Sequence, residues 1–453
     1  MLVDFSVENL LSFNERTSFS MVAGKERLKP EHKNTSLNSI STLKLATIFG
    51  ANASGKSNLI KAIELGKKLI TKEIDLTSKQ ASPFKLTEKP NPISTLEYKI
   101  QHKGYTYIYG FSFNSIKFSE EWLYLLKSRK GDAELVFDRK FIDNSTPEIE
   151  IGRFFKKRNI EITKAIFSNY KDDSLLISLI DQFNFNDESE GFNHLNNIFD
   201  WFTNSLTVIY PKSKATEGIQ HELNNNSDFR EVFSRFLNSL DTGIDNISFK
   251  EIKRENLSFP EKFLDKITST LLKKGTEKNT ASISDVAKGE LILVKRLKED
   301  QIKFYKLVTQ RKILGTDKLV DFDSTDEESD GTKRLFDLIP ILASAVKGDN
   351  VVIVDEIERS LHPNLVQSLI HYYLLFAKES NSQMILATHE SALLDQEMLR
   401  RDEIWFISKT KCGSSSLHSL SEYNERFDRE LRKNYLNGRF NGIPNLSEVN
   451  GKL

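Results

Sequence analysis

The chain has 453 residues, more than one average domain, so we expect either one large domain with an insertion or two to three modules. Its 64 basic and 64 acidic side chains cancel, which excludes a strong overall positive field for gathering nucleic acid and leaves room only for a local basic patch. The single cysteine, Cys412, excludes an internal disulfide and a zinc site built from cysteines.

The N-terminal sequence does not have the pattern of a signal peptide. Acidic residues occur among the first ten positions, and no basic region precedes an apolar core. No apolar stretch approaches the roughly 20 residues that a membrane span needs. We therefore expect a soluble, cytoplasmic protein without a membrane partner.

The first 130 residues predict strands around one helix. Two short alternating stretches within residues 1–24 predict strands joined by a loop at 11–16. An apolar run at 43–49 predicts a strand that ends at Gly50, and helical spacing begins at Ser57. Residues 93–125 predict three antiparallel strands with a hairpin turn at Lys103 and Gly104.

Residues 131–300 predict a mainly helical insertion. Its clearest element is an apolar stripe from Phe229 to Leu240, preceded by an N-cap at Ser227 or Asp228. Neither an internal repeat nor a heptad array occurs, which argues against a long coiled-coil arm.

Residues 301–453 begin with an acid-rich stretch, expected to be a solvated loop, and then predict alternating helices and strands. Helices are expected from Lys333 to Val346 and after Pro363. Short apolar strands are expected at 351–355, 383–389 and 403–408. Helices alternating with fully apolar strands indicate an α/β fold with a parallel sheet covered on both faces.

Residues 50–57, GANASGKS, match the phosphate-binding pattern G-x-x-x-x-G-K-S without a departure. In such a loop the glycines let backbone N–H groups face the phosphates, the lysine reaches the β and γ oxygens, and the serine hydroxyl binds Mg²⁺. The preceding strand and following helix provide the required context, so we predict ATP and Mg²⁺ as cofactors. The expected nucleotide-binding residues here are Gly50, Ala51, Asn52, Ala53, Ser54, Gly55, Lys56, Ser57 and Asn58.

Two later strands end in side chains suited to hydrolysis. Asp355 is expected to hold Mg²⁺ together with Ser57, and Glu356 to orient and polarise the attacking water. His389 closes the next strand, where it could donate a hydrogen bond to the γ-phosphate. Each feature alone is common in structural roles, but beside the phosphate loop they predict a catalytic set of Lys56, Glu356 and His389.

Ser329, Gly331 and Lys333 open the helix that precedes Asp355, and this segment resembles the signature motif of ABC-type ATPases, the group that includes SMC and RecF proteins. The resemblance implies an ABC-type P-loop ATPase head with a mixed sheet and an inserted helical subdomain. It also implies that the signature binds the γ-phosphate of ATP held by a second subunit, which makes the protein an ATP-bridged homo-oligomer, a dimer or higher.

Two further motifs of that group are less regular. Residues 358–362 stand where the group has its D-loop, although His362 replaces the usual aspartate. The glutamine that commonly reports on Mg²⁺ is not identifiable, and Gln80 and Gln101 are candidates by position only.

Seven segments together resemble the AAA15-type ATPases of bacterial anti-phage systems, and among these AriA of the PARIS system and AbiLi. They are NLLSF, FGANASGKSNLIKAI, SPFKL, SDGTKRLF, DEIERSLHP, RRDEIWFISK and YLNGRFNGIP. The resemblance implies an ATPase domain formed by residues 1–130 and 301–453, interrupted by the 131–300 insertion. It further implies two partners, a separate Toprim-type nuclease effector and a phage-encoded trigger protein.

Two other function classes remain open. A RecF-like DNA-repair ATPase would need a basic groove, for which Lys273-Lys274 and Lys295-Arg296-Lys298 are the best candidates, although charge on a solvated helix explains them more simply. DNA is therefore an alternative partner that the sequence does not favour. A motor subunit of a membrane transporter is disfavoured by the large insertion.

Overall fold

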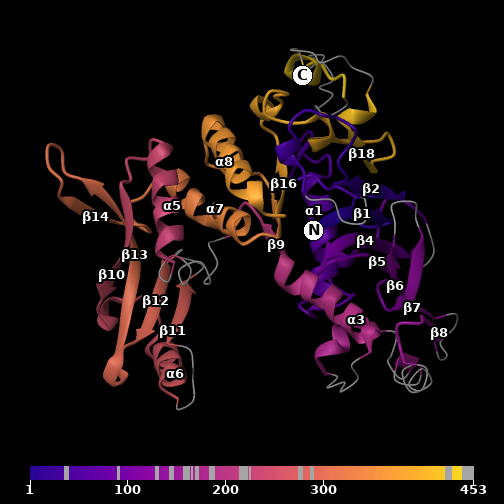
Figure 1. Ribbon diagram of the computed structural model, residues 1–453, viewed down its shortest axis with the longest axis horizontal. Helices are drawn as coiled ribbons and strands as arrows, with labels where there is room; N and C mark the ends of the chain where they lie inside the picture. The colour runs from indigo at the N-terminus through magenta and orange to yellow at the C-terminus, as the bar shows by residue number, and fades with distance from the viewer. Residues whose placement is uncertain are drawn as a thin grey trace, which may run out of the picture. The chain divides into compact units, whose positions relative to one another are not determined.

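The computed structural model describes residues 1–34, 40–88, 92–127, 132–141, 147–156, 164, 167–168, 173–182, 189–213, 223, 226–273, 279–285, 290–423 and 431–440. The chain forms two compact units, which appear in Figure 1. The first comprises Met1–Pro211, Ser344–Glu358 and Leu374–Leu453, and the second Lys212–Ala343 and Arg359–Tyr373. No helix within the described residues has the length and apolarity needed to cross a membrane.

The first unit contains a six-stranded sheet. Its order is β18 (Ser415–Ser419), β17 (Ile404–Lys409), β3 (Leu45–Phe49), β16 (Gln383–Thr388), β15 (Val351–Val354) and β9 (Leu206–Ile209). All neighbours are parallel except β17 and β18. Strands β3, β16 and β15 are buried along their length, which explains their continuous apolar sequences. Because parallel strands end at one edge, the segments that follow these three strands lie close together.

A seven-stranded antiparallel sheet also belongs to the first unit. Its order is β2 (Thr17–Ser20), β1 (Leu2–Glu8), β4 (Ser94–His102), β5 (Tyr105–Phe113), β6 (Phe118–Leu126), β7 (Ala133–Lys140) and β8 (Glu148–Ile151). Lys103 and Gly104 both have positive φ, 46° and 83°, as the tight turn between β4 and β5 requires. The strands and hairpin predicted within residues 1–125 are thus confirmed.

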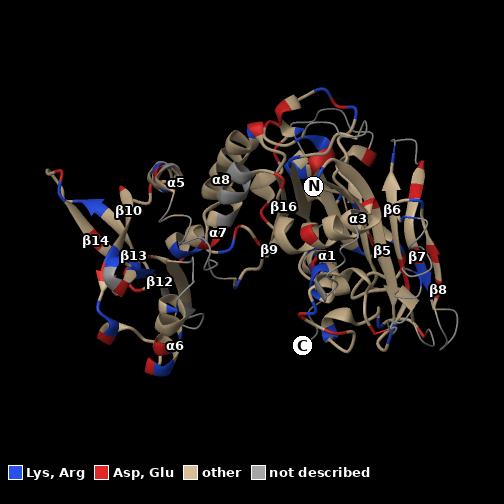
Figure 2. Cartoon of the chain, turned by 60° about the horizontal axis from the view of Figure 1, so that its bottom comes forward, with Lys and Arg blue, Asp and Glu red and all other residues tan. Residues whose placement is uncertain are grey.

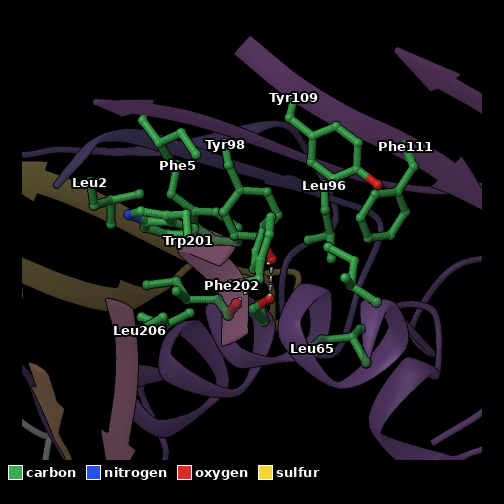
Figure 3. Packing of buried hydrophobic residues seen from close by; sticks show 14 of the residues in the cluster. Leu2, Phe5, Leu65, Leu96, Tyr98, Tyr109, Phe111, Trp201, Phe202 and Leu206 are labelled. Carbon is green, nitrogen blue, oxygen red and sulfur yellow. Dashed lines mark hydrogen bonds between the residues drawn. The ribbon is translucent and has the colours of Figure 1, made fainter. Parts of the chain in front are cut away.

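Helix α1 (Lys56–Ile70) leaves the phosphate loop and packs on an aromatic core (Figure 3). Its closest approach is at Gly66, where an added Cβ would lie 2.7 Å from Cζ of the Tyr98 ring. The Tyr98 hydroxyl accepts a hydrogen bond from the Gly66 N–H at 3.2 Å and donates to the Ile63 carbonyl at 3.0 Å. Trp201 and Phe202, which follow α3 (Glu190–Asp200), pack around the same ring. The helix that begins at Lys56 is therefore fixed against strand β4.

The second unit contains a five-stranded sheet. Its order is β10 (Asn246–Ile252), β13 (Ile302–Lys312), β12 (Glu290–Arg296) and β11 (Thr280–Asp285), and β14 (Leu319–Asp323) pairs with the second half of β13. Helix α6 (Glu261–Leu272) packs Leu264 and Leu271 against Val294 and Phe304 of this sheet. Helix α5 (Ser227–Ser239) has the predicted buried stripe, but its N-cap is Asn226, whose side chain accepts from the Phe229 N–H at 3.0 Å.

Contrary to the expectation, the described part of residues 131–300 is not mainly helical but combines helices with strands. Strands β7 and β8 extend the seven-stranded sheet, β9 joins the six-stranded sheet, and β10 to β12 build the sheet of the second unit. These strands are short and carry charged residues, as in NISFKEI at 246–252, so their alternation is weak. Strands β9 and β10 pair with β15 and β13, which lie far away in sequence, so pairing rather than local propensity makes them strands.

Helices α7 (Asp330–Lys347) and α8 (Pro363–Phe376) contribute residues to both units. Helix α7 begins three residues earlier than Lys333, because the Ser329 hydroxyl accepts from the Thr332 N–H at 3.2 Å and so caps its first turn. Helix α8 begins at Pro363 as predicted, where a missing N–H costs nothing.

Residues 431–440, the last that the structure describes, pack beside the strand that precedes the phosphate loop. Tyr435 of α9 (Leu431–Leu436) lies 6.1 Å from Phe49 between ring centroids, and Phe440 stacks on Phe406 at 4.7 Å. Residues 441–444 of the segment YLNGRFNGIP lie outside the described residues. The described part of this tail therefore covers Phe49 at the end of β3 and Phe406 within β17.

Candidate functional site

The phosphate loop, residues 50–57, connects β3 to α1 in a tightly packed turn. A Cβ added at Gly50 would lie 2.5 Å from the Ile407 carbonyl oxygen. One added at Gly55, which has a φ of 120°, would lie 2.9 Å from the Ser415 Cβ. Ala53 also has a positive φ, 62°, so the loop bends through conformations that side chains disfavour. The two glycines of the motif are therefore required by space and by backbone geometry.

Ser415 supports this loop from strand β18. Its Oγ lies 2.7 Å from the Ser54 carbonyl oxygen and 2.9 Å from Ser12 Oγ, and its N–H donates to the Ser12 carbonyl at 2.7 Å. No sequence pattern indicated this role, because Ser415 lies in a serine-rich stretch without a motif. The loop is thus held by segments from both ends of the chain.

Lys56 is buried inside the loop. Its Nζ donates to the carbonyls of Gly50 at 2.7 Å and Ala51 at 3.1 Å, and lies 3.2 Å from Nδ1 of His389. Burial lowers the pKa of Lys56 to about 8, and the carboxylates of Glu358, Asp355 and Glu356 partly oppose this decrease. The structure therefore brings two of the three predicted catalytic residues together.

His389 follows β16 at the same edge of the sheet. Burial lowers its pKa, and the neighbouring positive charge of Lys56 lowers it further. Its imidazole is therefore mainly neutral near pH 7, with one ring nitrogen able to donate a hydrogen bond.

Asp355 is buried at the end of β15 and fits the expected Mg²⁺ site. Burial raises its pKa, a hydrogen bond with Ser57 opposes the rise, and the adjacent Glu356 charge adds to it. Its Oδ1 is buried and has no hydrogen-bond partner among the described residues. A cation would satisfy that oxygen, so Asp355 and Ser57 would hold Mg²⁺, which often takes one or two protein ligands beside phosphate oxygens. When bound, Mg²⁺ would neutralise phosphate charge.

The described residues contain no group of three or more His, Cys, Asp or Glu side chains arranged to hold a metal by themselves. This agrees with a site that phosphate oxygens would complete.

Glu356 follows Asp355 with a φ of 47°, in the left-handed region that non-glycine residues rarely adopt. Such strained positions occur at functional sites, where the surrounding structure enforces them. Contacts on both sides of Glu356 enforce this φ. The buried strand β15 precedes it, and the Ile357 N–H that follows donates to the Ala387 carbonyl at 3.4 Å.

Glu358, expected only as the start of the D-loop segment, also belongs to this site. Its carboxylate accepts from the His389 N–H at 2.7 Å and from the Thr388 hydroxyl at 2.8 Å. It also provides the largest acidic contribution opposing the decrease in the pKa of Lys56. The signal that could have found it is a third carboxylate directly after the buried strand β15.

We expect Glu358→Gln to weaken hydrolysis about tenfold, because one neutral amide replaces a carboxylate that accepts two hydrogen bonds. The loss of its charge also lowers the pKa of Lys56, so ATP affinity should begin to fall at a lower pH than in the wild type. Hydrolysis rates and an ATP titration between pH 6 and about 9 check both effects. The exposed Glu397→Gln is the matched control, and a pH profile identical to the wild type would contradict the assigned role.

The signature residues lie in the second unit. Ser329 is exposed and caps α7, the Lys333 N–H donates to the Ser329 carbonyl at 2.9 Å, and Gly331 follows in the first turn. A Cβ added at Gly331 would lie 3.0 Å from the Ser360 carbonyl oxygen and otherwise meets only Ser329 Oγ, at 3.8 Å. Their contact with the nucleotide of a second subunit stays a prediction.

Only part of the acid-rich stretch before the signature is the expected solvated loop: Asp326 and Glu327 are exposed in a turn, but the other carboxylates fold onto the sheet. Residues 319–323 form β14, where Asp321 pairs with Lys250 at 3.1 Å and Asp323 with Lys306 at 2.7 Å. Glu328 is buried and pairs with Arg311. Paired cations from β10 and β13 explain why these carboxylates fold onto a sheet.

The remaining candidate residues have structural contacts. Gln101 is 2% exposed in β4 and donates to the Ile40 carbonyl at 3.3 Å, which is unsuited to reporting on a bound ion. Gln80 accepts from Lys68 at 3.2 Å. His362 accepts from the Asn364 N–H at 3.3 Å at the start of α8.

The basic candidates for a DNA-binding groove are partly neutralised. Arg296 pairs with Asp300 at 2.6 Å, and Lys295 Nζ lies 5.2 Å from the centroid of the Tyr305 ring. Lys273 and Lys298 are exposed, while Lys274 lies outside the described residues. Figure 2 shows basic and acidic residues interspersed over this unit.

Comparison with protein families identifies the chain at this point. The family model described as "AAA domain, putative AbiEii toxin, Type IV TA system" matches residues 45–395. The chain belongs to this AAA family. The match covers the phosphate loop, the signature and the strand ends at Asp355 and His389. The AAA family description names neither AriA nor AbiLi, so a resemblance to those systems stays a prediction.

No curated protein matches the chain. Among solved structures, the SMC head domain from Thermotoga maritima is 12% identical with a TM-score of 0.37, over 92% of this chain and 98% of that one. The SmcHead bound to the C-winged helix domain of ScpA is 14% identical with a TM-score of 0.43, over 92% and 97%. The Smc head domain with an extended coiled coil, bound to the C-terminal domain of ScpA derived from Pyrococcus furiosus, is 12% identical with a TM-score of 0.40, over 92% and 96%.

The predicted α/β class with a mixed sheet is confirmed by the topology and the match to the AAA family model. The site then consists of three strand ends. The end of β3 provides the loop with Lys56, the end of β15 provides Asp355 and Glu356, and the end of β16 provides His389. This arrangement suits the binding of a metal-bound triphosphate and the activation of a water beside it.

Proposed function

We propose that this AAA-family protein binds ATP with Mg²⁺ at the phosphate loop and hydrolyses it. Lys56 would leave the carbonyls of Gly50 and Ala51 to bind the β and γ phosphate oxygens. Glu356 would orient the water, and neutral His389 would donate a hydrogen bond to the γ-phosphate. The single observation that carries this proposal is the meeting of Lys56, Asp355 and His389 at one edge of the parallel sheet.

ATP would also join two or more copies. Ser329, Gly331 and Lys333 of one copy would bind the γ-phosphate held by another. The exposed position of Ser329 and the half-buried position of Gly331 support this proposal, because a second copy could reach both residues. Hydrolysis would separate the copies, so the ATP cycle would act as a switch between joined and separated states.

The biological role that we propose is a sensor and switch in an anti-phage, abortive-infection system. The family description, which refers to a toxin and a type IV TA system, supports this class. The effector would be a separate nuclease, of the Toprim type, and the trigger a phage-encoded protein. The alternative is a RecF-like or SMC-like ATPase that clamps DNA, which the pairing of Arg296 with Asp300 does not favour.

The wild-type protein tests this proposal directly. We expect ATP hydrolysis that requires Mg²⁺ and stops when EDTA is added, because Asp355 and Ser57 need the ion to hold the triphosphate. We also expect the molar mass, measured by light scattering, to increase with ATP and Mg²⁺ and to fall as ADP forms. Hydrolysis that proceeds equally in EDTA would contradict the assigned metal site.

The effect of duplex DNA on the hydrolysis rate distinguishes the proposed switch from the DNA clamp. Duplex DNA that stimulates hydrolysis, with stimulation falling steeply as salt increases, would favour the clamp. An unchanged rate in DNA would favour the switch.

A further inference from the structure

The residue directly before the signature is held by an arginine of the second unit. Glu328 is 6% exposed, and its two carboxylate oxygens accept from Arg311 Nη1 at 2.7 Å and Nη2 at 2.9 Å. The hydroxyl of Thr309, which is fully buried, donates to the same carboxylate. A bidentate pair of this kind fixes both the position and the orientation of the carboxylate.

Strand β13 sets the position of this pair. Thr309 and Arg311 are alternate residues of β13, so both side chains project from one face of the sheet. The Arg311 guanidinium lies 4.5 Å from the centroid of Phe322, which β14 places opposite Thr309. Arg311 therefore has an aromatic ring and a buried carboxylate to hold it in place.

The turn between β14 and Glu328 is also bound to the sheet and to itself. Ser324 Oγ donates to the Leu307 carbonyl at 2.8 Å. Asp323 Oδ1 accepts from the Thr325 N–H at 2.7 Å, and Glu327 accepts from the Asp323 N–H at 2.6 Å. Ser329, which caps α7, follows at once, so this turn leaves the start of the helix little freedom to move.

We propose that Arg311 is a positioning residue for the signature. By holding Glu328 it places Ser329 and Gly331 in the geometry that binds the γ-phosphate of a second copy, and it makes the five-stranded sheet of the second unit part of the switch. This inference rests on the proposed function, in which the signature joins copies through ATP.

The physical reason is the cost of leaving Glu328 without its cation. A buried carboxylate that loses Arg311 moves toward water, and Ser329 and Gly331 move with it. A displacement of about 1 Å at an acting group can weaken its effect about 100-fold. The phosphate loop belongs to the first unit and does not depend on this pair.

The test measures self-association and ATP affinity separately, in the Glu356→Gln background so that ATP persists. We expect Arg311→Ala to raise the dissociation constant of the ATP-dependent assembly about 30- to 100-fold, with ATP affinity at the phosphate loop changing less than about twofold. Arg254→Ala is the matched control, because Arg254 pairs with Glu261 at 2.5 Å and Asp265 at 2.6 Å elsewhere in the same unit. Arg254→Ala should change neither the dissociation constant of the assembly nor the ATP affinity.

Two further variants keep the test decisive. Arg311→Lys retains the charge but not the fork of donors, so it should fold and weaken assembly about tenfold. Arg311→Ala combined with Glu328→Ala should weaken assembly no more than Glu328→Ala alone, because Arg311 acts through Glu328.

The outcomes separate this inference from the proposed function. In one outcome, Glu356→Gln assembles with ATP and Gly331→Val abolishes the assembly, but neither Arg311→Ala nor Arg311→Lys weakens it. That outcome overturns the role of Arg311 and leaves the ATP-bridged switch standing. If Glu356→Gln does not assemble with ATP at all, the proposed function itself is overturned.

Discussion

Glu356→Gln is expected to reduce ATP hydrolysis about 1000-fold, because a positioned general base contributes roughly 100- to 10,000-fold and an amide cannot accept the proton. The substitution keeps the size of the side chain and the strained φ of 47°, so the fold and the ATP affinity should persist. Because separation of the copies requires hydrolysis, the variant should accumulate as an ATP-bound oligomer.

Single-turnover hydrolysis and size-exclusion chromatography with light scattering measure the two effects. The exposed Glu397→Gln should behave as the wild type and controls for the loss of a carboxylate outside the site. A Glu356→Gln protein whose mass with ATP equals its mass without nucleotide would contradict the ATP-bridged assembly. Hydrolysis at the wild-type rate would contradict the catalytic role of Glu356.

Lys56→Ala is expected to weaken ATP binding about 100-fold. Its ammonium group would form about two charge-assisted hydrogen bonds to phosphate oxygens, each contributing at least about 1.5 kcal/mol, and about 1.4 kcal/mol corresponds to a tenfold change in affinity. The loop should keep its shape, because Gly50 and Gly55 are fixed by Ile407 and Ser415. Titration with a fluorescent ATP analogue measures the affinity. The matched control is Lys72→Ala, an exposed lysine beyond the end of α1.

The pKa of Lys56 also predicts how the affinity for ATP depends on pH. Burial lowers its pKa to about 8 in the free protein, and bound phosphates stabilise the charged form, so the pKa is higher in the complex. ATP affinity should therefore be constant below about pH 8 and fall up to tenfold for each pH unit above it, until the pKa of the complex is reached.

Lys56→Arg should remove this pH dependence whatever its absolute affinity, because a guanidinium stays protonated throughout this range. A wild-type affinity that stays constant up to pH 10 would show that Lys56 keeps its proton without ATP. That result would contradict the role of burial in the site.

The same pKa affects stability. The folded state holds the proton of Lys56 less tightly than the unfolded chain does, with a folded pKa of about 8 against an ordinary value of 10.5. The unfavourable contribution of the buried charge is complete below about pH 8 and disappears as the pH rises toward the unfolded value. Lys56 alone would therefore make the protein more stable between pH 8 and 10, an effect that ATP opposes by favouring the charged form.

The local sequence was sufficient to predict the strands, loop and helix that form the nucleotide site. Residues 50–57 predict their own loop, because the spacing of glycine, lysine and serine is specific and because an apolar strand and an amphipathic helix flank it. The buried strands β3, β15 and β16 were predicted for a related reason, since strands covered on both faces have continuous apolar sequences. Their shared edge then followed from the parallel arrangement.

The sequence misled where the structure depends on distant partners. Residues 246–252 form a strand by pairing with residues 304–310 of β13, which follow much later in the chain. The acid-rich stretch before Ser329 looked like a solvated loop, yet Lys250, Lys306 and Arg311 compensate those of its carboxylates that fold onto the sheet. Neither pairing leaves a local pattern of hydrophobicity or spacing.

The sequence by itself determined that this protein has a phosphate loop, two carboxylates after a buried strand and a histidine after the next, because each depends on residue types at short fixed spacing. Only the tertiary structure decided that Glu358 fixes His389, that Ser415 supports the loop and that Arg311 holds the residue before the signature. Glu358 and Ser415 act through hydrogen bonds, and Arg311 acts through an ion pair. All three contacts form where strands come together. Which strands meet is decided by the burial and pairing of the whole chain rather than by neighbours in sequence.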